Sequence, residues 1–183
     1  MNTTLNEIRS HRPCEESWER LLREQGKTQA DDELLPYSRI LEICGLNDTL
    51  WAIAHCHPRG PWVCAEFSLW CAEGIRHMIE DPSPIAALDT ARKYLDGDAT
   101  QTQLRESIIP AWAAIYLTGR AADRAAAFAA DCVEELSSSC SVGSIIAYAA
   151  NYAAIYAEDC SSDWDAARTA QRSKLLGLLE EMP

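Results

Sequence analysis

The chain has 183 residues and a formal net charge of −12 at pH 7, with 48% hydrophobic and 24% charged residues. A chain of this length can bury one substantial core, so we expect residues 1–183 to form a single domain. The negative charge disfavours direct binding to nucleic acid or to an anionic membrane, and it favours a protein partner with a basic surface.

The beginning of the chain predicts two helices. Residues 5–11 follow Thr4, a typical N-cap residue, and Glu7 stands at the position that completes a capping box. Residues 14–25 carry apolar side chains on one helical face. Gly26 is expected to end this second helix, because glycine readily adopts the left-handed conformation found after helices.

Further elements are expected before the middle of the chain. Pro36 is expected to open a helix that ends at Gly45, and Asn47 to cap the next one. Residues 57–61 contain two prolines and a glycine, which predicts a turn. Residues 62–80 then carry apolar side chains at helical spacing and predict the best-formed helix of the chain.

Serine, threonine and proline mark the helices that follow. Ser83 is expected to cap a helix that stops near Gly97, and Thr100 or Thr102 to begin the next. Pro110 lies inside this second helix. Because proline lacks the amide hydrogen that the helix uses, we expect a kink or a division there.

Between positions 108 and 156, alanine is interrupted by large aromatic residues. Alanine has the highest helix propensity and lets backbones approach closely, and aromatic side chains fill the remaining gaps. We expect closely packed helices over residues 121–136 and 144–158, with a loop over 137–141 between them. This region therefore predicts a rigid scaffold.

The predicted fold class is all-α, a compact bundle or stack of about ten mostly antiparallel helices. Ser161 or Ser162 is expected to cap the last helix. The uncharged run over 137–157 is too interrupted to predict a membrane span. The N-terminus resembles no secretion signal, so we expect a cytoplasmic protein whose eight cysteines stay reduced.

No motif indicates catalysis or a cofactor. Gly26-Lys27-Thr28 resembles the end of a phosphate-binding loop, but Leu21 stands where that signature needs a glycine. No G-x-S-x-G motif is present, and Ser144 is interpreted as a helix cap. We therefore expect a protein that is not an enzyme and binds no cofactor.

One segment supports a metal site as an alternative. It contains three cysteines and three histidines, namely His55, Cys56, His57, Cys64, Cys71 and His77. Zinc sites usually combine closely spaced pairs of such ligands, and no C-x₂₋₄-C or H-x₃₋₅-H pair occurs here. We expect no metal ligands, and buried thiols are the simpler interpretation.

Two segments are candidate partner-binding sites. The first is a predicted loop with three adjacent acidic residues, Asp31, Asp32 and Glu33. The second flanks the predicted turn and comprises His55, His57 and Arg59. Such surface charges are commonly only solvated. The functional hypothesis is that the acidic loop forms part of a face that meets a basic partner, which speeds association.

Five stretches of the chain resemble, in order and spacing, a family of all-helical bacterial and phage immunity proteins. They are residues 13–22, 26–36, 41–52, 84–100 and 166–172. The resemblance implies a protein that binds and neutralises a toxin, and it transfers no catalytic residue. The chain departs from the family at residues 55–61, where cysteine, histidine and proline replace a more acidic connector.

Four functions follow from these observations. The leading hypothesis is an immunity-type inhibitor that binds a toxin or effector and occludes its functional site. The second is a phage counter-defence protein, anti-CRISPR-like, that blocks the nucleic-acid site of a host defence complex. The others are an enzyme with a Cys/His or zinc site, and a structural role in an oligomer, a homodimer included, through aromatic residues such as Trp62 or Tyr116.

Overall fold

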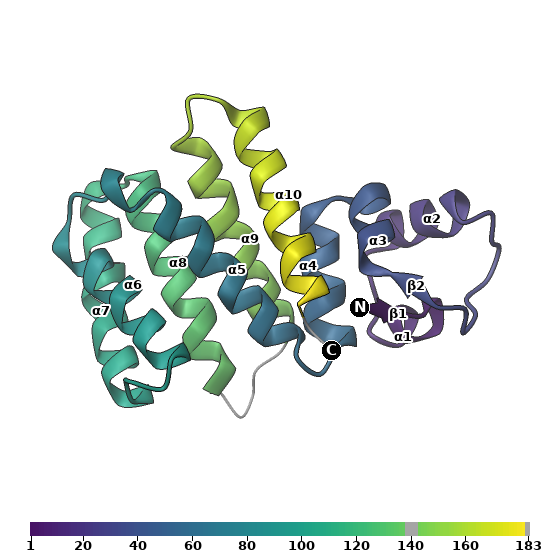
Figure 1. Ribbon diagram of the computed structural model, residues 1–183, viewed down its shortest axis with the longest axis horizontal. Helices are drawn as coiled ribbons and strands as arrows, with labels where there is room; N and C mark the ends of the chain where they lie inside the picture. The colour runs from purple at the N-terminus through teal and green to yellow at the C-terminus, as the bar shows by residue number, and fades with distance from the viewer. Residues whose placement is uncertain (138–142, 182–183) are drawn as a thin grey trace.

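The computed structural model describes residues 1–137 and 143–181, and its N-terminal part forms one end of an elongated molecule (Figure 1). This part contains a two-stranded antiparallel sheet, in which Asn2 lies opposite Pro36 and Thr3 opposite Leu35. The elements are β1 Asn2–Thr3, α1 Leu5–Ser10, α2 Glu15–Glu24, β2 Leu35–Pro36, α3 Tyr37–Cys44 and α4 Leu46–Cys56. The sequence did not predict the sheet, because two-residue strands are too short to show alternation.

The rest of the described chain is helical. It comprises α5 Gly60–Gly74, η1 Arg76–Met78, α6 Pro82–Leu95, α7 Gln101–Thr118, α8 Ala121–Glu134, η2 Glu135–Ser137, α9 Gly143–Asp159 and α10 Trp164–Glu180. Figure 1 shows α8, α9 and α10 running alternately down, up and down. The described residues thus form ten α-helices and two very short strands, which confirms the predicted all-α class.

Several predicted helix ends are confirmed. The Thr4 hydroxyl accepts a hydrogen bond from the Glu7 amide at 3.1 Å. Of the two candidates for the start of α7, Thr100 is the cap, and it forms a reciprocal capping box with Gln103. Gly26 has a φ of 64°, the left-handed conformation that favours glycine at a helix end.

The prediction that Asn47 caps α4 is wrong. Gly45 separates α3 from α4 with a φ of 85°, and α4 begins directly after it at Leu46. The turn after α4 is also shorter than predicted, because Pro61 belongs to the first turn of α5. The helix expected to reach position 80 ends at Gly74 and is followed by the short 3₁₀ segment η1.

Two other predicted caps are displaced along the chain. The cap of α6 is Asp81, whose carboxylate accepts a hydrogen bond from the Ser83 amide at 2.8 Å. The cap of α10 is Asp163 rather than Ser161 or Ser162. Serine and aspartate are similarly good caps, so local preference alone did not choose between neighbouring candidates.

Pro110 does not divide α7. The helix runs without interruption from Gln101 to Thr118, with Pro110 inside it. Proline removes the hydrogen bond to the carbonyl four residues earlier, that of Glu106. Both residues are exposed, so water can satisfy the freed carbonyl and the helix continues.

The alanine-rich helices pack closely, as the sequence predicts. Helix α8 packs against α5, α6, α7 and α9, and α9 also packs against α4 and α5. The buried alanines on these two helices are Ala122, Ala125, Ala126, Ala127, Ala129, Ala130, Ala147, Ala149, Ala150, Ala153, Ala154 and Ala157. They belong to one connected cluster of buried side chains that extends from Leu5 to Leu179.

Two predictions fall outside the part of the chain that the structure describes. The loop expected over 137–141 lies there except for its first residue. The cap expected at Ser144 depends on a side chain that is likewise not described.

Candidate functional site

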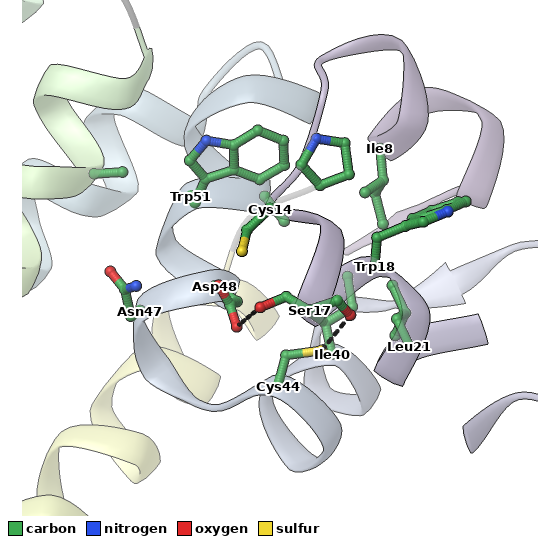
Figure 2. A pocket seen from close by; sticks show the side chains of 13 residues that line it. Ile8, Cys14, Ser17, Trp18, Leu21, Ile40, Cys44, Asn47, Asp48 and Trp51 are labelled. Carbon is green, nitrogen blue, oxygen red and sulfur yellow. Dashed lines mark hydrogen bonds between the residues drawn. The ribbon is translucent and has the colours of Figure 1, made fainter. Parts of the chain in front are cut away.

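A hollow of about 210 Å³ lies among the first four helices. Figure 2 shows Trp18 and Trp51 on either side of it, with Cys14 pointing into the space between them. Its walls come from α1 to α4, the connector before α2, and one residue of α9, and they comprise Ile8, Pro13, Cys14, Ser17, Trp18, Leu21, Ile40, Cys44, Asn47, Asp48, Trp51, Ala52 and Ala147.

Helical spacing places the main wall residues. In α2, Trp18 and Leu21 are three residues apart and face inward. In α4, Asp48 and Trp51 have the same spacing, so a carboxylate and an indole line the hollow from one helical face. Both helices therefore contribute an aromatic ring to a largely apolar surface.

The polar side of the hollow is organised around Asp48. Its Oδ2 accepts a hydrogen bond of 2.7 Å from the Ser17 hydroxyl, and Arg20 lies 3.8 Å from the same oxygen. The Asp48 side chain is 25% exposed. A carboxylate that is held in place and still reaches solvent can receive a cationic group from a partner.

The thiol of Cys44 is held in its neutral form at the same place. Its Sγ donates to the Ser17 carbonyl over 3.8 Å. Burial, followed by the nearby Asp48 charge, raises the pKa of Cys44 to about 11. A thiol with this pKa is a poor nucleophile at neutral pH, so it contributes an apolar wall rather than a reactive group.

The predicted acidic loop is largely occupied by contacts within the chain. The Lys27 ammonium lies 2.8 Å from Asp31 and 2.8 Å from Glu33, and Asn6 donates to Asp32 at 2.8 Å. The Lys27 hydrogen bond lowers the pKa of Asp31. The lysine offsets part of the charge, so the loop is a weaker acidic feature than its sequence indicates.

The second predicted segment lies closer to the hollow. The imidazole of His55 is stacked on Trp51, with 4.4 Å between ring centroids, and its Nδ1 lies 2.9 Å from the Trp51 carbonyl oxygen. His57 accepts a hydrogen bond from the Arg59 amide, and the Arg59 guanidinium lies 5.4 Å from the Trp62 ring. Of this segment, His55 borders a wall of the hollow.

No sequence pattern identifies the residues that form the hollow. The sequence predicts only that Trp18 lies in the helix over residues 14–25, and that Asp48 and Trp51 lie in the helix that follows Asn47. An indole on an amphipathic helix usually belongs to the core, and Trp18 is indeed buried. What distinguishes the site is the space left between two helices, which no local pattern reports.

The structure does not assemble the cysteine and histidine segment into a metal site. No group of three His, Cys, Asp or Glu side chains converges as metal ligands in residues 1–137 and 143–181. Cys64 and Cys71 are buried, and the Cys64 thiol donates to the Leu50 carbonyl at 3.7 Å. Burial raises the pKa of Cys56 to about 12.

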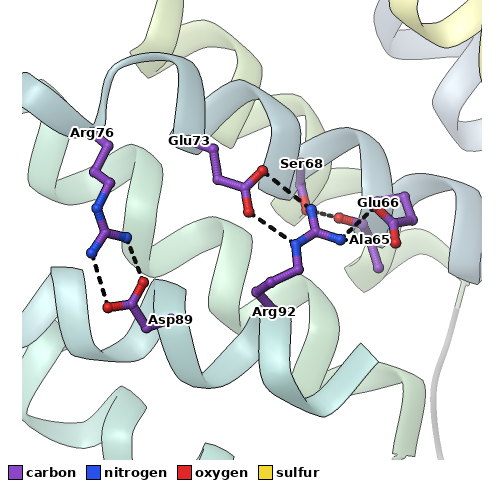
Figure 3. Close-up of polar contacts among 7 residues, drawn as sticks. All are labelled: Ala65, Glu66, Ser68, Glu73, Arg76, Asp89 and Arg92. Atoms are coloured by element: carbon purple, nitrogen blue, oxygen red, sulfur yellow. Dashed lines mark hydrogen bonds and ion pairs between the residues drawn. The ribbon is translucent and has the colours of Figure 1, made fainter. Parts of the chain in front are cut away.

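A second polar cluster joins α5 to α6 (Figure 3). The Arg92 guanidinium donates to both carboxylate oxygens of Glu66 and to both of Glu73, over 2.9–3.2 Å. Nearby, Arg76 binds Asp89. The Arg92 pairs tie α6 to α5, and the Arg76 pair ties α6 to η1, so the cluster holds these elements together.

No protein-family model, curated protein or solved structure matches the chain. The resemblance to immunity proteins therefore rests on the sequence stretches given above. Among the helices of the described residues, none combines the length and the apolar character needed to span a bilayer.

Proposed function

We propose that the protein acts without catalysis, as an immunity-type inhibitor that binds a protein toxin or effector through the hollow between α2 and α4. The observation that carries the proposal is an open, mainly apolar hollow beside the carboxylate of Asp48, on a chain with a net charge of −12. Concave apolar sites with a few placed polar groups are the usual binding sites of proteins.

The size of the hollow favours a side chain over a cofactor. Ligand pockets usually have volumes of roughly 300–1,000 Å³, and this hollow has about 210 Å³. Interfaces commonly depend on a few aromatic or basic side chains that fill such recesses. The indoles of Trp18 and Trp51 offer contact to an aromatic or aliphatic anchor residue of the partner.

The charges around the hollow favour a basic residue beside that anchor. Asp48 presents a carboxylate within the hollow, and Glu15, Glu16 and Glu19 are exposed on α2. A lysine or arginine next to the anchor would bind Asp48 directly. The surrounding acidic residues would speed encounter with a basic surface, most strongly at low salt.

The segments that the sequence analysis selected take secondary roles in this proposal. His55 supports Trp51 from behind the wall. Asp31, Asp32 and Glu33 contribute to the long-range negative field, although Lys27 offsets part of their charge. The hypothesis of direct contact at these residues, and at His57 and Arg59, stays a prediction.

The proposal is tested by blocking the hollow. Cys14 is exposed and points into it, so Cys14→Trp fills the space without removing a buried side chain. Leu34→Trp adds the same ring at another exposed position and is the matched control. Wild-type protein should retain a specific basic protein from a host lysate at low and moderate salt, and protect cells in which that protein is expressed as a toxin.

Cys14→Trp should lose both retention and protection, while Leu34→Trp should keep both. Equal retention by the two variants would show that the hollow is not the binding site. If the retained protein belongs to a defence complex that binds nucleic acid, the counter-defence function is supported instead. The net charge of −12 favours that alternative too, because acidic surfaces can occupy sites for a phosphate backbone.

A further inference from the structure

A polar hollow of about 400 Å³ lies where the start of α4 meets α9 and α10. Helix α9 packs against both of the others, and Figure 1 shows the three side by side. The volume falls in the usual range of ligand pockets, roughly 300–1,000 Å³. The walls carry the charged side chains of Glu158, Arg168 and Arg172. Two arginines face one carboxylate, so the hollow is locally positive on a chain with a net charge of −12.

One side of this hollow can hold an anion. The exposed Arg172 guanidinium donates to the Leu41 carbonyl at 3.3 Å and forms no ion pair with any described residue. Gly45 has no side chain that could cap α4, so the first amides of the helix, which also line the hollow, have no partner within it. Asp48, in the first turn of α4, lies in the wall of the other hollow. Free amides at a helix start, together with an arginine, commonly bind carboxylates.

The other side of the hollow has buried acceptors that lack donors. Gln171 is 3% exposed, and its Nε2 donates to the Ala154 carbonyl at 2.9 Å, whereas its Oε1 accepts no hydrogen bond from any described residue. Glu158 is also 3% exposed, and its Oε2 accepts from Arg168 at 3.2 Å. Gln171 borders a second hollow next to α5 as well, but the walls of that one carry no arginine, lysine or carboxylate. Because a buried acceptor without a donor costs free energy, Gln171 and Glu158 favour a ligand that donates hydrogen bonds.

The buried carboxylate selects the kind of donor. Burial raises the pKa of Glu158 although Arg168 opposes this, so one arginine does not offset the whole cost of burying the charge. A second cation beside Glu158 would stabilise the carboxylate, whereas a purely anionic ligand would be repelled by it. The hollow therefore fits a zwitterion, with its cationic group at Glu158 and Gln171 and its anionic group at Arg172.

We propose that this hollow binds a free α-amino acid. The carboxylate of the ligand accepts hydrogen bonds from Arg172 and the first amides of α4, and its ammonium group donates to Glu158 and Gln171. A peptide does not meet this requirement, because its ammonium and carboxylate groups stand at opposite ends. The apolar side chains of Leu46 and Ile155 also line the hollow, so we expect an amino acid with an apolar side chain.

Isothermal titration calorimetry with three probes tests the class of ligand. L-leucine carries both charged groups, N-acetyl-L-leucine lacks the ammonium group, and L-leucinamide lacks the carboxylate. Leucine should bind, and each derivative should bind at least about tenfold more weakly, because hydrogen bonds to charged groups commonly contribute that much to affinity. Equal affinity for leucine and N-acetyl-leucine overturns the proposal, and so does a failure of all common apolar L-amino acids to bind.

Two substitutions test which end of the ligand lies where. Arg172→Gln should weaken the binding of leucine at least about tenfold and leave that of leucinamide unchanged. Lys174→Gln removes the same charge from α10 outside the hollow and is the matched control, with no effect on either probe. Glu158→Gln should weaken the binding of leucine and should not weaken that of N-acetyl-leucine. Unchanged binding of leucine by Arg172→Gln, or equal weakening of all three probes with thermal unfolding showing an intact fold, overturns this arrangement.

Discussion

The indole of Trp51 forms a wall of the hollow on one side and stacks on the imidazole of His55 on the other, with an interplanar angle of 27°. The two residues are four positions apart in α4, which is the spacing that brings helical side chains together. This pair links the segment selected from the sequence to the site that the structure reveals.

The first prediction concerns the titration of His55. Burial, and then the neighbouring His11, lower the pKa of His55 below its usual value of 6.5. Its imidazole is therefore expected to titrate below pH 6.5 in an NMR experiment. Since the unfolded chain takes up this proton at higher pH than the folded chain does, stability is lost as the pH falls from 6.5 through the lower pKa of the folded state.

The cause of this shift can be checked separately. His11→Ala removes a like charge but leaves most of the burial of His55, so the midpoint should rise only in part towards 6.5. A midpoint of His55 at or above 6.5 in the wild-type protein would contradict the arrangement of these side chains.

The second prediction concerns Gly60, where α5 begins against α4. A Cβ atom at this position would lie 1.8 Å from the Ile53 carbonyl oxygen. Gly60→Ala should therefore separate the two helices and cost about 3 kcal/mol or more of unfolding free energy. Chemical denaturation measures this loss.

Gly177 provides the matched control for that substitution. It lies within α10 with nothing within 4 Å of an added Cβ. Gly177→Ala should stabilise the protein by about 0.5–1 kcal/mol, because alanine favours the helix and restricts the unfolded chain. Equal changes in unfolding free energy for the two substitutions would show that α5 does not approach α4 closely at Gly60.

The third prediction compares two arginines, Arg92 of α6 and Arg76 of the short segment η1 that follows α5. Arg92 holds two carboxylates with a side chain that is 30% exposed, whereas Arg76 holds one and is 41% exposed. Arg92→Met leaves Glu66 and Glu73 without their partner and should cost about 1–3 kcal/mol. Arg76→Met should cost less than about 1 kcal/mol, as for most exposed ion pairs. A larger loss of unfolding free energy for Arg76→Met than for Arg92→Met in urea denaturation would contradict these ion pairs.

The fourth prediction concerns Asp131 in α8. Burial, followed by the charges of Glu135 and Glu134, raises its pKa to about 6. A carboxyl group with a raised pKa in the folded state makes the protein less stable as the pH rises from 3.8 to 6. Asp131→Asn should therefore stabilise the protein at pH 7 by an amount on the order of 2 kcal/mol.

The gain from Asp131→Asn should fade as the pH falls towards 4, where the wild-type carboxyl group is neutral as well. Denaturation at several pH values measures the difference. Asp96→Asn, at an exposed position, is the control for the same change in net charge. A gain that is independent of pH would indicate a cause other than the charge of Asp131.

Local chemistry was sufficient for much of the secondary structure. Thr100 begins a helix and Gly26 ends one as predicted, because cap preferences depend on a few neighbouring residues. The same preferences failed where two candidates stood close together, as with Asp81 and Ser83. The division expected at Pro110 does not occur, since α7 continues through this residue.

The surface was harder to predict than the core. Asp31 and Glu33 stand in an acidic run, yet Lys27 binds both of them. Trp112 and Tyr116 belong to the same alanine-rich segment, yet the first packs edge-on against Phe128 and the second is exposed. Residue type alone does not distinguish a paired charge from an unpaired one, or an aromatic core residue from a surface one.

The sequence by itself determined the all-α class, most helix limits and the close packing of the alanine-rich helices, since helix propensity, caps and apolar spacing act over a few residues. Only the tertiary structure decided that Trp18, Asp48 and Trp51 surround one hollow and that Ile109, Tyr116 and Leu117 of α7 are exposed. Both features depend on how helices that are distant in sequence meet. An apolar side chain that faces a neighbouring helix and one that faces solvent can have the same helical spacing in the sequence.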